Sequence, residues 1–185
     1  MEIARCIKPT VEIIGAMHWI EQSIFRDKGR TPEEIRERLE NKGGIHLLVQ
    51  EKNTPVGYVT TYPLQPLTTE IRLNDPECIP DTKALYIDTW AFFDPANTPE
   101  MMSPFWKILV TQAKGEGYNT LAAHFTQEPS QRFQKLGMIY IRTVDNWNNT
   151  NISYDHLQYN LNPEKEKPVR LKPRSPQRAP AYAGT

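Results

Sequence analysis

The stretch from Ala84 to Phe93 constrains the fold most, because it is apolar along its whole length except at Asp88. A strand that is apolar on both faces has to be covered on both sides. Such strands lie at the centre of sheets that carry helices above and below. The sequence therefore predicts an α/β (α+β) fold with residues 84–93 as a central strand.

Turn and capping signals divide the rest of residues 1–160 into shorter elements. Thr10, Thr31-Pro32-Glu33-Glu34, Ser103-Pro104 and Glu128-Pro129 are typical of helix starts, and they predict four helices. Apolar runs and alternation predict further strands over 2–8, 45–51, 56–62, 119–125, 138–144 and 153–161. Together these elements predict a mixed central sheet of about seven strands with helices on both faces. Residues 63–82 contain four prolines and are expected to form a long loop.

The last 25 residues differ from the rest in composition. Residues 161–185 hold six basic residues, two acidic residues and five prolines, so their net charge is +4 and that of residues 1–160 is −4. A basic, proline-rich segment with few large apolar residues does not build a core. We expect a domain over 1–160 and an extended tail over 161–185, either solvated or serving as an arm that docks on a protein partner.

The overall composition limits the function classes. The 22 Lys and Arg residues balance the 22 Asp and Glu residues, which makes nucleic acid and anionic membranes unlikely partners. Two cysteines, Cys6 and Cys78, are too few for a disulfide framework or a four-thiolate zinc site. No apolar run reaches the ~20 residues of a membrane span, and the N-terminus lacks a signal-peptide pattern. These features predict a cytoplasmic protein, or one within a particle assembled in the cytoplasm.

The order of the expected elements resembles the GNAT superfamily of N-acetyltransferases over most of 1–160. The resemblance is carried by the hairpin 48–59, the strand 84–93, the helix 103–116 and residues 131–138, Gln-Arg-Phe-Gln-Lys-Leu-Gly-Met. It implies two central parallel strands that splay apart and hold acetyl-coenzyme A, with the pyrophosphate at the start of the helix after the first of them. It also implies an amine acceptor, on a small molecule or a protein, that attacks the thioester directly.

Two departures from the family pattern concern the donor site. The family places a glycine-rich turn at the pyrophosphate, whereas residues 94–104 contain no glycine, lysine or arginine. Pro99 and Pro104 also remove two main-chain donors. Many family members carry a general-acid tyrosine where this sequence has Phe133. The sequence therefore predicts a weakened or lost donor site.

Cofactor-binding candidates lie at the start of the helix after residue 103. Met102, Phe105 and Trp106 could line an acyl pocket, with Ser103 as the helix N-cap. Apolar residues at this spacing are as readily explained as a core stripe.

Asp88 and His124 are the catalytic candidates. Asp88 lies inside an apolar strand, where an unpaired carboxylate is costly, and it could accept a proton from an incoming amine. A structural role, with Asp88 hydrogen-bonded to the neighbouring backbone or capping a bulge, is the alternative. His124 ends a strand at the carboxyl edge of the sheet, where open α/β sheets bind ligands. His18, His46 and His156 show no metal-ligand spacing, so we expect no metal site.

Three functions remain open at this level. The first is an N-acyltransferase that uses acetyl-coenzyme A with an atypical donor site. The second is a catalytically silent member of the same fold that docks into a larger assembly, such as a viral particle, through the arm 161–185. The third is that the tail, with Pro173-Arg174-Ser175-Pro176, is itself the ligand of an aromatic groove or of nucleic acid.

Overall fold

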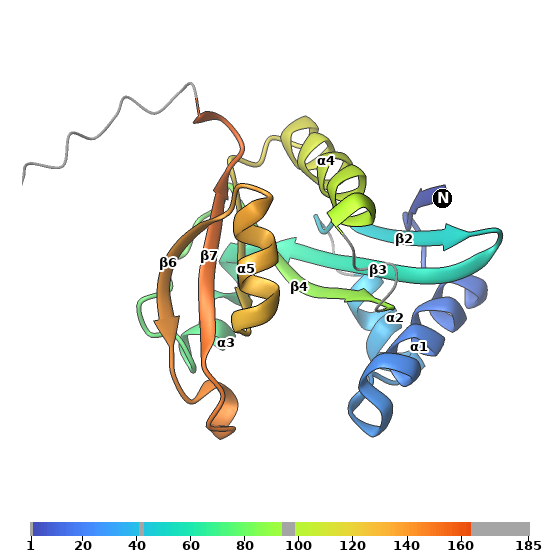
Figure 1. The fold of residues 1–185 in the computed structure, drawn as a ribbon, viewed down its shortest axis with the longest axis horizontal. Coiled ribbons are helices and arrows are strands. Elements are labelled where there is room, and N and C mark those ends of the chain that lie inside the picture. The colour runs from blue at the N-terminus through green and yellow to red at the C-terminus, as the bar shows by residue number, and fades with distance from the viewer. Residues whose placement is uncertain (1, 41–42, 94–98, 164–185) are drawn as a thin grey trace, which may run out of the picture.

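The structure is a computed structural model, and it describes residues 2–40, 43–93 and 99–163. Figure 1 shows one twisted sheet flanked by helices. The strands are β1 (Glu2–Arg5), β2 (His46–Glu51), β3 (Thr54–Pro63), β4 (Ala84–Phe92), β5 (Thr120–Phe125), β6 (Ile139–Val144) and β7 (Tyr154–Asn160). The helices are α1 (Val11–Phe25), α2 (Pro32–Glu40), α3 (Leu64–Arg72), α4 (Pro99–Gly115) and α5 (Gln127–Lys135), with short 3₁₀ turns η1 (Arg26–Lys28) and η3 (Trp147–Asn149).

The sheet has the order β1-β2-β3-β4-β5-β7-β6. Among the described strands β4 and β5 pair in parallel, and the other neighbours are antiparallel. The prediction of a mixed seven-stranded sheet is therefore confirmed. The β4–β5 crossover passes through α4, which is the connection that a parallel pair requires.

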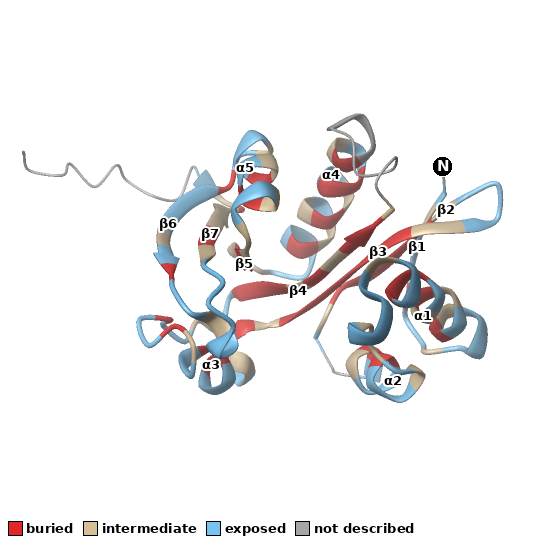
Figure 2. Ribbon diagram, turned by 60° about the horizontal axis from the view of Figure 1, so that its bottom comes forward, coloured by how far each residue is buried: buried red, intermediate tan, exposed pale blue. Residues whose placement is uncertain are grey.

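The two faces of the sheet carry different helices. The largest core lies under α4 and α5 and includes Phe105, Leu109 and Phe133. A second core joins α1 and α2 to β2, β3 and β4, and a third lies under α3 against β4 and β5. Strands β3 and β4 run between these layers and are the most continuously buried part of the chain (Figure 2). Helices on both faces are thus confirmed.

The capping box at Thr31 is confirmed in atomic detail. The Glu34 N–H donates to Thr31 Oγ1 at 3.3 Å, and the Thr31 N–H donates to Glu34 Oε2 at 2.8 Å. These reciprocal bonds satisfy two of the donors that a helix start leaves free. They fix the start of α2 directly after the segment that carries Arg30.

Two local expectations are wrong. Residues 63–82 are not one long loop, because α3 occupies Leu64–Arg72. Pro63 and Pro66 lie at its N-terminal end, where main-chain N–H groups have no helical partner and proline is tolerated. Ser103 does not cap a helix, because α4 begins a turn earlier, at Pro99.

Some expectations fall outside the described residues. The structure does not describe residues 94–98, which belong to the segment where the family places the pyrophosphate turn. It also does not describe residues 164–185, which make up most of the expected basic tail. Within the described part of the chain, no helix has both the length and the hydrophobicity to cross a bilayer.

Candidate functional site

The parallel pair β4–β5 separates part of the way along its length. The paired residues run from Ala84 with Thr120 to Ile87 with Ala123. Beyond that point β4 continues to Phe92, with β3 as its one neighbour among the described strands. On β3, Thr60 pairs with Thr89 and Thr61 pairs with Ile87, so Asp88 is the extra residue of a β-bulge. A bulge re-aims side chains next to sites, and here it lies where the two strands part.

Asp88 is held by four hydrogen-bond donors. Its Oδ2 accepts from Arg38 Nη1 at 2.5 Å and from Arg30 Nη2 at 3.3 Å. It also accepts from the hydroxyls of Thr89 at 2.8 Å and Thr60 at 3.3 Å. Both expected roles of Asp88 are compatible with this position, since the carboxylate is satisfied at a bulge and still borders two cavities.

The cations beside Asp88 belong to a larger network. Arg30 Nη1 donates to Glu21 Oε1 at 2.8 Å, and the Tyr58 hydroxyl donates to the same buried carboxylate. Burial alone would lower the pKa of Arg30, but Asp88, Tyr58 and Glu21 raise it above its ordinary value. Arg30 therefore stays charged, and it ties the segment between α1 and α2 to the bulge of β4.

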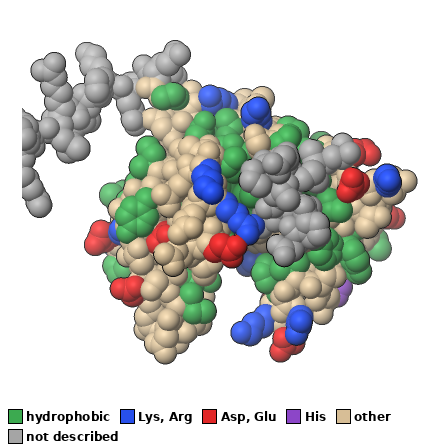
Figure 3. Space-filling view, in the orientation of Figure 1, with side chains coloured by type: hydrophobic (Ala, Val, Ile, Leu, Met, Phe, Trp, Pro, Cys, Tyr) green, Lys and Arg blue, Asp and Glu red, His purple; other side chains and the backbone are tan. Residues whose placement is uncertain are grey.

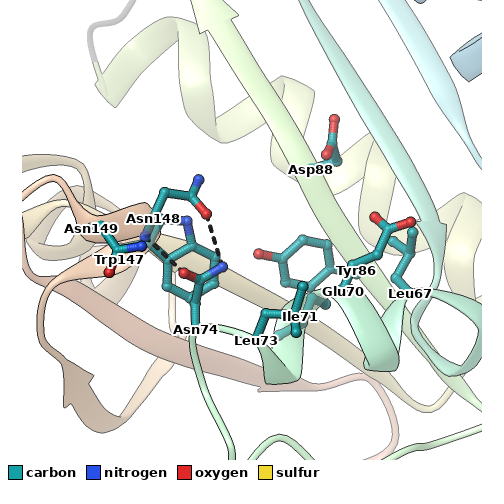
Figure 4. A pocket seen from close by; sticks show the side chains of 10 residues that line it. All are labelled: Leu67, Glu70, Ile71, Leu73, Asn74, Tyr86, Asp88, Trp147, Asn148 and Asn149. Atoms are coloured by element: carbon teal, nitrogen blue, oxygen red, sulfur yellow. Dashed lines mark hydrogen bonds between the residues drawn. The ribbon is translucent and has the colours of Figure 1, made fainter.

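Asp88 is one of the residues that line a cavity of about 600 Å³, at its edge, and in Figure 4 its carboxylate points away from the other lining side chains. The cavity walls come from α3, from β4 and from the η3 loop, and they combine two carboxylates, three amides, two aromatic rings and three aliphatic side chains: Glu70, Asp88, Asn74, Asn148, Asn149, Tyr86, Trp147, Leu67, Ile71 and Leu73. Polar and apolar groups together suit a ligand that carries charge on a hydrocarbon frame.

Asparagines shape the η3 side of this cavity. Asn146, Asn148, Asn149 and Asn151 all have positive φ angles, which asparagine tolerates better than most residues. Asn74 Nδ2 donates to Asn148 Oδ1 at 2.9 Å, and the Asn148 N–H donates to Asn74 Oδ1 at 2.7 Å. This reciprocal pair joins the η3 loop to the end of α3.

A second cavity, of about 340 Å³, lies at the opening between β4 and β5. Asp88, Thr89 and Trp90 border it from β4, and His124 and Phe125 border it from β5. The segment after α1 contributes Lys28 and Arg30. Asp88 and His124, which the sequence proposed as catalytic residues, thus border one cavity.

His124 is buried inside a polar cluster. The Tyr86 hydroxyl lies 3.1 Å from His124 Nδ1, and His124 Nε2 lies 3.0 Å from Asp75 Oδ2. Burial lowers the pKa of His124 despite the opposing charge of Asp75. Asp75 also accepts from Arg142 Nε at 3.1 Å and from Arg142 Nη2 at 2.5 Å. Both ring nitrogens of His124 are therefore engaged, which favours a positioning role over direct proton transfer.

Three of the four cofactor candidates lie in the core. Met102, Phe105 and Trp106 are buried in the cluster under α4 and α5, as a core stripe would be, and Ser103 is half-buried. Trp90 packs edge-on against Phe105 and Phe133, with ring centroids 4.9 and 4.8 Å apart. The Nε1 atom of Trp90 is buried without a hydrogen-bond partner among the described residues.

Sequence reasoning missed most partners of the two candidates. Arg30 and Arg38 precede Asp88 by 58 and 50 residues, and Asp75 precedes His124 by 49. His156 was dismissed on its spacing along the chain, whereas strand pairing places it directly opposite His124. Thr89 is the exception, because it directly follows Asp88 and could have been recognised as a partner from the sequence.

No family model and no curated protein matches this sequence. Solved structures match over most of the chain. An aminoglycoside 6'-N-acetyltransferase from Enterococcus faecium has a TM-score of 0.69 at 10% identity, covering 87% of this chain and 97% of its own. The ribosomal-protein-S18-alanine N-acetyltransferase from Escherichia coli has a TM-score of 0.64 at 9% identity, over 86% and 93%. Ard1 from Thermoplasma volcanium has a TM-score of 0.66 at 9% identity, over 86% and 96%.

A mixed seven-stranded sheet with one parallel pair, and a helix between the two strands of that pair, define the architecture of this chain. These structures carry the same architecture, and the chain has the GNAT fold.

Proposed function

We propose that this protein is an N-acyltransferase that takes its acyl group from acetyl-coenzyme A and transfers it to an amine. The observation that carries the proposal is the position of Asp88. Its carboxylate lies at the bulge where β4 leaves β5, and it borders both cavities. A related fold solved as an aminoglycoside 6'-N-acetyltransferase was complexed with coenzyme A, at a TM-score of 0.68.

The described residues fit the thioester end of such a donor. The Thr89–Phe92 edge of β4 that faces away from β3 has no partner among the described strands, so its main-chain groups can pair with an extended amide-containing arm. The buried Nε1 of Trp90 is a donor in need of an acceptor. Acetyl-coenzyme A would supply an acyl group activated as a thioester.

The acceptor amine is proposed to enter the cavity of about 600 Å³ beside Asp88. Asp88 is paired with Arg30 and Arg38, and Glu70 adds a further negative charge to the wall of this cavity. That charge attracts an ammonium group. Asp88 takes one proton from the ammonium group, which frees the nitrogen lone pair. A nitrogen–carbon bond then forms, the carbon–sulfur bond breaks, and the leaving thiolate takes the second proton of the nitrogen.

Asp88 orients the amine and takes up its proton. Positioning supplies much of the rate in reactions of this kind. Two guanidinium groups hold the carboxylate in place, and this favours orientation of the nucleophile. His124 is not assigned the proton, because both of its ring nitrogens are engaged; it positions Tyr86 on the cavity wall.

The first experiment measures donor binding by the full chain. Acetyl-coenzyme A is expected to raise the melting temperature of the wild type and of Asp88→Asn equally, because binding to the native state alone stabilises it. No rise at millimolar concentration would contradict the proposal.

The second experiment measures acyl transfer as release of free thiol, with a polyamine, an amino sugar and a peptide with a free N-terminus as acceptors. Asp88→Asn should lower kcat/KM by about 10²-fold or more. Glu37→Gln, an exposed change on α2 that leaves the network intact, is the matched control. Full activity of Asp88→Asn would refute its role.

A catalytically silent protein that docks through residues 161–185 is the second candidate. Trp90, Phe105 and Phe133 pack together beside the splay, and the sequence ahead of α4 lacks glycine. This alternative predicts that a protein partner co-purifies with the full chain and is lost when residues 161–185 are deleted. It also predicts no thiol release with any amine. For either candidate we propose a cytoplasmic location, on the basis of the two reduced cysteines.

A further inference from the structure

Strand register brings two histidines and an arginine into one row. His124 of β5 pairs with His156 of β7, and His156 also pairs with Arg142 of β6. Directly opposed residues in a sheet share a face, so the two imidazoles lie side by side, with ring centroids 4.5 Å apart. Asp75, from the segment between α3 and β4, reaches the same place.

The potential ligand atoms of Asp75, His124 and His156 all lie within 4.8 Å of one another. His124 Nε2 is 3.0 Å from Asp75 Oδ2, and His156 Nδ1 is 3.4 Å from the same oxygen. Zinc binds nitrogen and oxygen at about 2.0–2.2 Å, so ligand atoms around a tetrahedral ion are about 3.3–3.6 Å apart. The two separations from Asp75 Oδ2 lie near this range and no separation exceeds 4.8 Å, so the side chains would have to rotate inward to bring all three atoms to zinc distances.

The His156 ring shows that the cluster is incomplete as a hydrogen-bonded network. His156 is 4% exposed, and its Nδ1 has no hydrogen-bond partner among the described residues. A buried polar atom without a partner calls for an explanation, such as an ion. His156 Nδ1 faces Asp75 Oδ2 at 3.4 Å, an ion-pair distance that falls short of hydrogen-bond geometry, so the buried atom has a charge contact in place of a hydrogen bond.

Each candidate ligand also has an outer partner, as metal ligands in proteins usually do. The Tyr86 hydroxyl lies 3.1 Å from Nδ1 of His124, the nitrogen that would not bind the ion. The Gln158 side-chain nitrogen lies 3.3 Å from Nε2 of His156; with zinc on Nδ1 that Nε2 would carry the proton, so the Gln158 amide would turn over and accept through its oxygen. Arg142 holds both oxygens of Asp75. These contacts orient the three ligands toward one another.

We propose that Asp75, His124 and His156 form a zinc site with a fourth position for water. Two imidazoles and one carboxylate are a ligand set that Zn²⁺ accepts. On binding, His124 moves its proton from Nε2 to Nδ1 and donates to Tyr86, so that Nε2 is free for the metal. The ion would join β5 and β7 to the segment after α3, with its fourth position open to water as in zinc sites that have three protein ligands.

Arg142 gives the proposal a discriminating test. The Arg142 guanidinium already neutralises the charge of Asp75 and therefore repels a zinc ion bound to the same carboxylate. The carboxylate still has enough lone pairs to accept from Arg142 and to bind the ion. Arg142→Gln should destabilise the metal-free protein and should increase the rise in melting temperature on adding Zn²⁺. If the cluster is only an ion pair, Zn²⁺ will not rescue the stability of Arg142→Gln.

The main experiment uses the full chain, freed of metal with a chelator and titrated with Zn²⁺. We expect one zinc per chain, a higher melting temperature and, with Co²⁺ in its place, visible absorption typical of a tetrahedral site. His156→Gln should weaken zinc binding by at least about 10-fold. His46→Leu, which removes a buried histidine outside the cluster, should leave zinc binding unchanged.

Two results would overturn the proposal. One is a wild-type chain that takes up no zinc above the level of a chelator-treated blank, which does not depend on how any variant folds. The other is a folded His156→Gln that binds zinc as tightly as the wild type. Either outcome would leave the proposed acyl transfer untouched, since that is measured at Asp88.

Discussion

His46 makes the stability of the protein depend on pH. Its side chain is 3% exposed in β2, and neither ring nitrogen has a hydrogen-bond partner among the described residues. Burial, with help from the charge of Arg5, lowers the pKa of His46 from 6.5 to about 4, against the opposing effect of Asp88. The folded protein therefore holds a neutral imidazole over a range in which the unfolded chain holds a charged one.

The sign and the size follow from this difference. As the pH falls below 6.5 the unfolded chain takes up a proton that the native state refuses until about pH 4, so stability is lost as the pH falls through this window. Below pH 4 the lowered pKa of His46 reduces the free energy of unfolding by about 3 kcal/mol relative to its value at neutral pH. About 2 kcal/mol of this reduction occurs between pH 7.5 and pH 5. For a domain with a total stability of about 5–15 kcal/mol this is a large share.

His46→Leu replaces the titrating imidazole with an apolar side chain at the same buried position. Urea denaturation of the full chain, followed by tryptophan fluorescence at pH 7.5 and pH 5.0, gives the free energy of unfolding of both proteins. The wild type should lose about 2 kcal/mol more than His46→Leu between the two pH values. The pKa of His156 is also lowered by burial, to about 4, but that group is present in both proteins and cancels. If the free energy of unfolding falls by the same amount in the wild type and in His46→Leu, His46 does not cause the pH dependence and the reasoning is refuted.

Two further changes test local packing and capping, each by the free energy of unfolding. In Gly57→Ala the new Cβ would overlap the ring of Phe92 on the neighbouring strand, so a loss of about 1–3 kcal/mol is expected; a neutral effect would show that the ring moves aside freely. Thr31→Ala removes the oxygen that accepts from the Glu34 N–H and should cost about 0.5–2 kcal/mol, while Thr31→Ser should retain most of the stability. Equal losses for the alanine and serine variants would refute the capping argument.

The central strand and the capping box were predictable because their signals are local. A run of apolar residues specifies a doubly covered strand, and Thr31 with Glu34 specifies a helix start. Helix α3 was missed because prolines at 63 and 66 were interpreted as loop signals, although both lie where a helix tolerates them. The start of α4 was misplaced for a similar reason, since both Pro99 and Pro104 are compatible with a first turn.

The candidate site was predictable only in part. Asp88 stood out as the one charged residue in an apolar strand, but Arg30 and Arg38 reach it from segments that tertiary packing brings close. The approach of His124 to His156 depends on strand register, which a single sequence does not specify between distant strands. Asp75 was placed in a loop, and its burial depends on the position of α3.

The short parallel pairing of β4 with β5 has a mechanical consequence. Four residue pairs connect the antiparallel half β1–β4 to the antiparallel half β5–β7. The two halves are also joined by side chains in the core under α4 and α5 and in the core under α3, both of which include residues of β4 and β5. A stretching force applied across the sheet should open this seam before it unzips either half. A ligand bound between β4 and β5 would contact both halves of the sheet and raise the force needed to separate them.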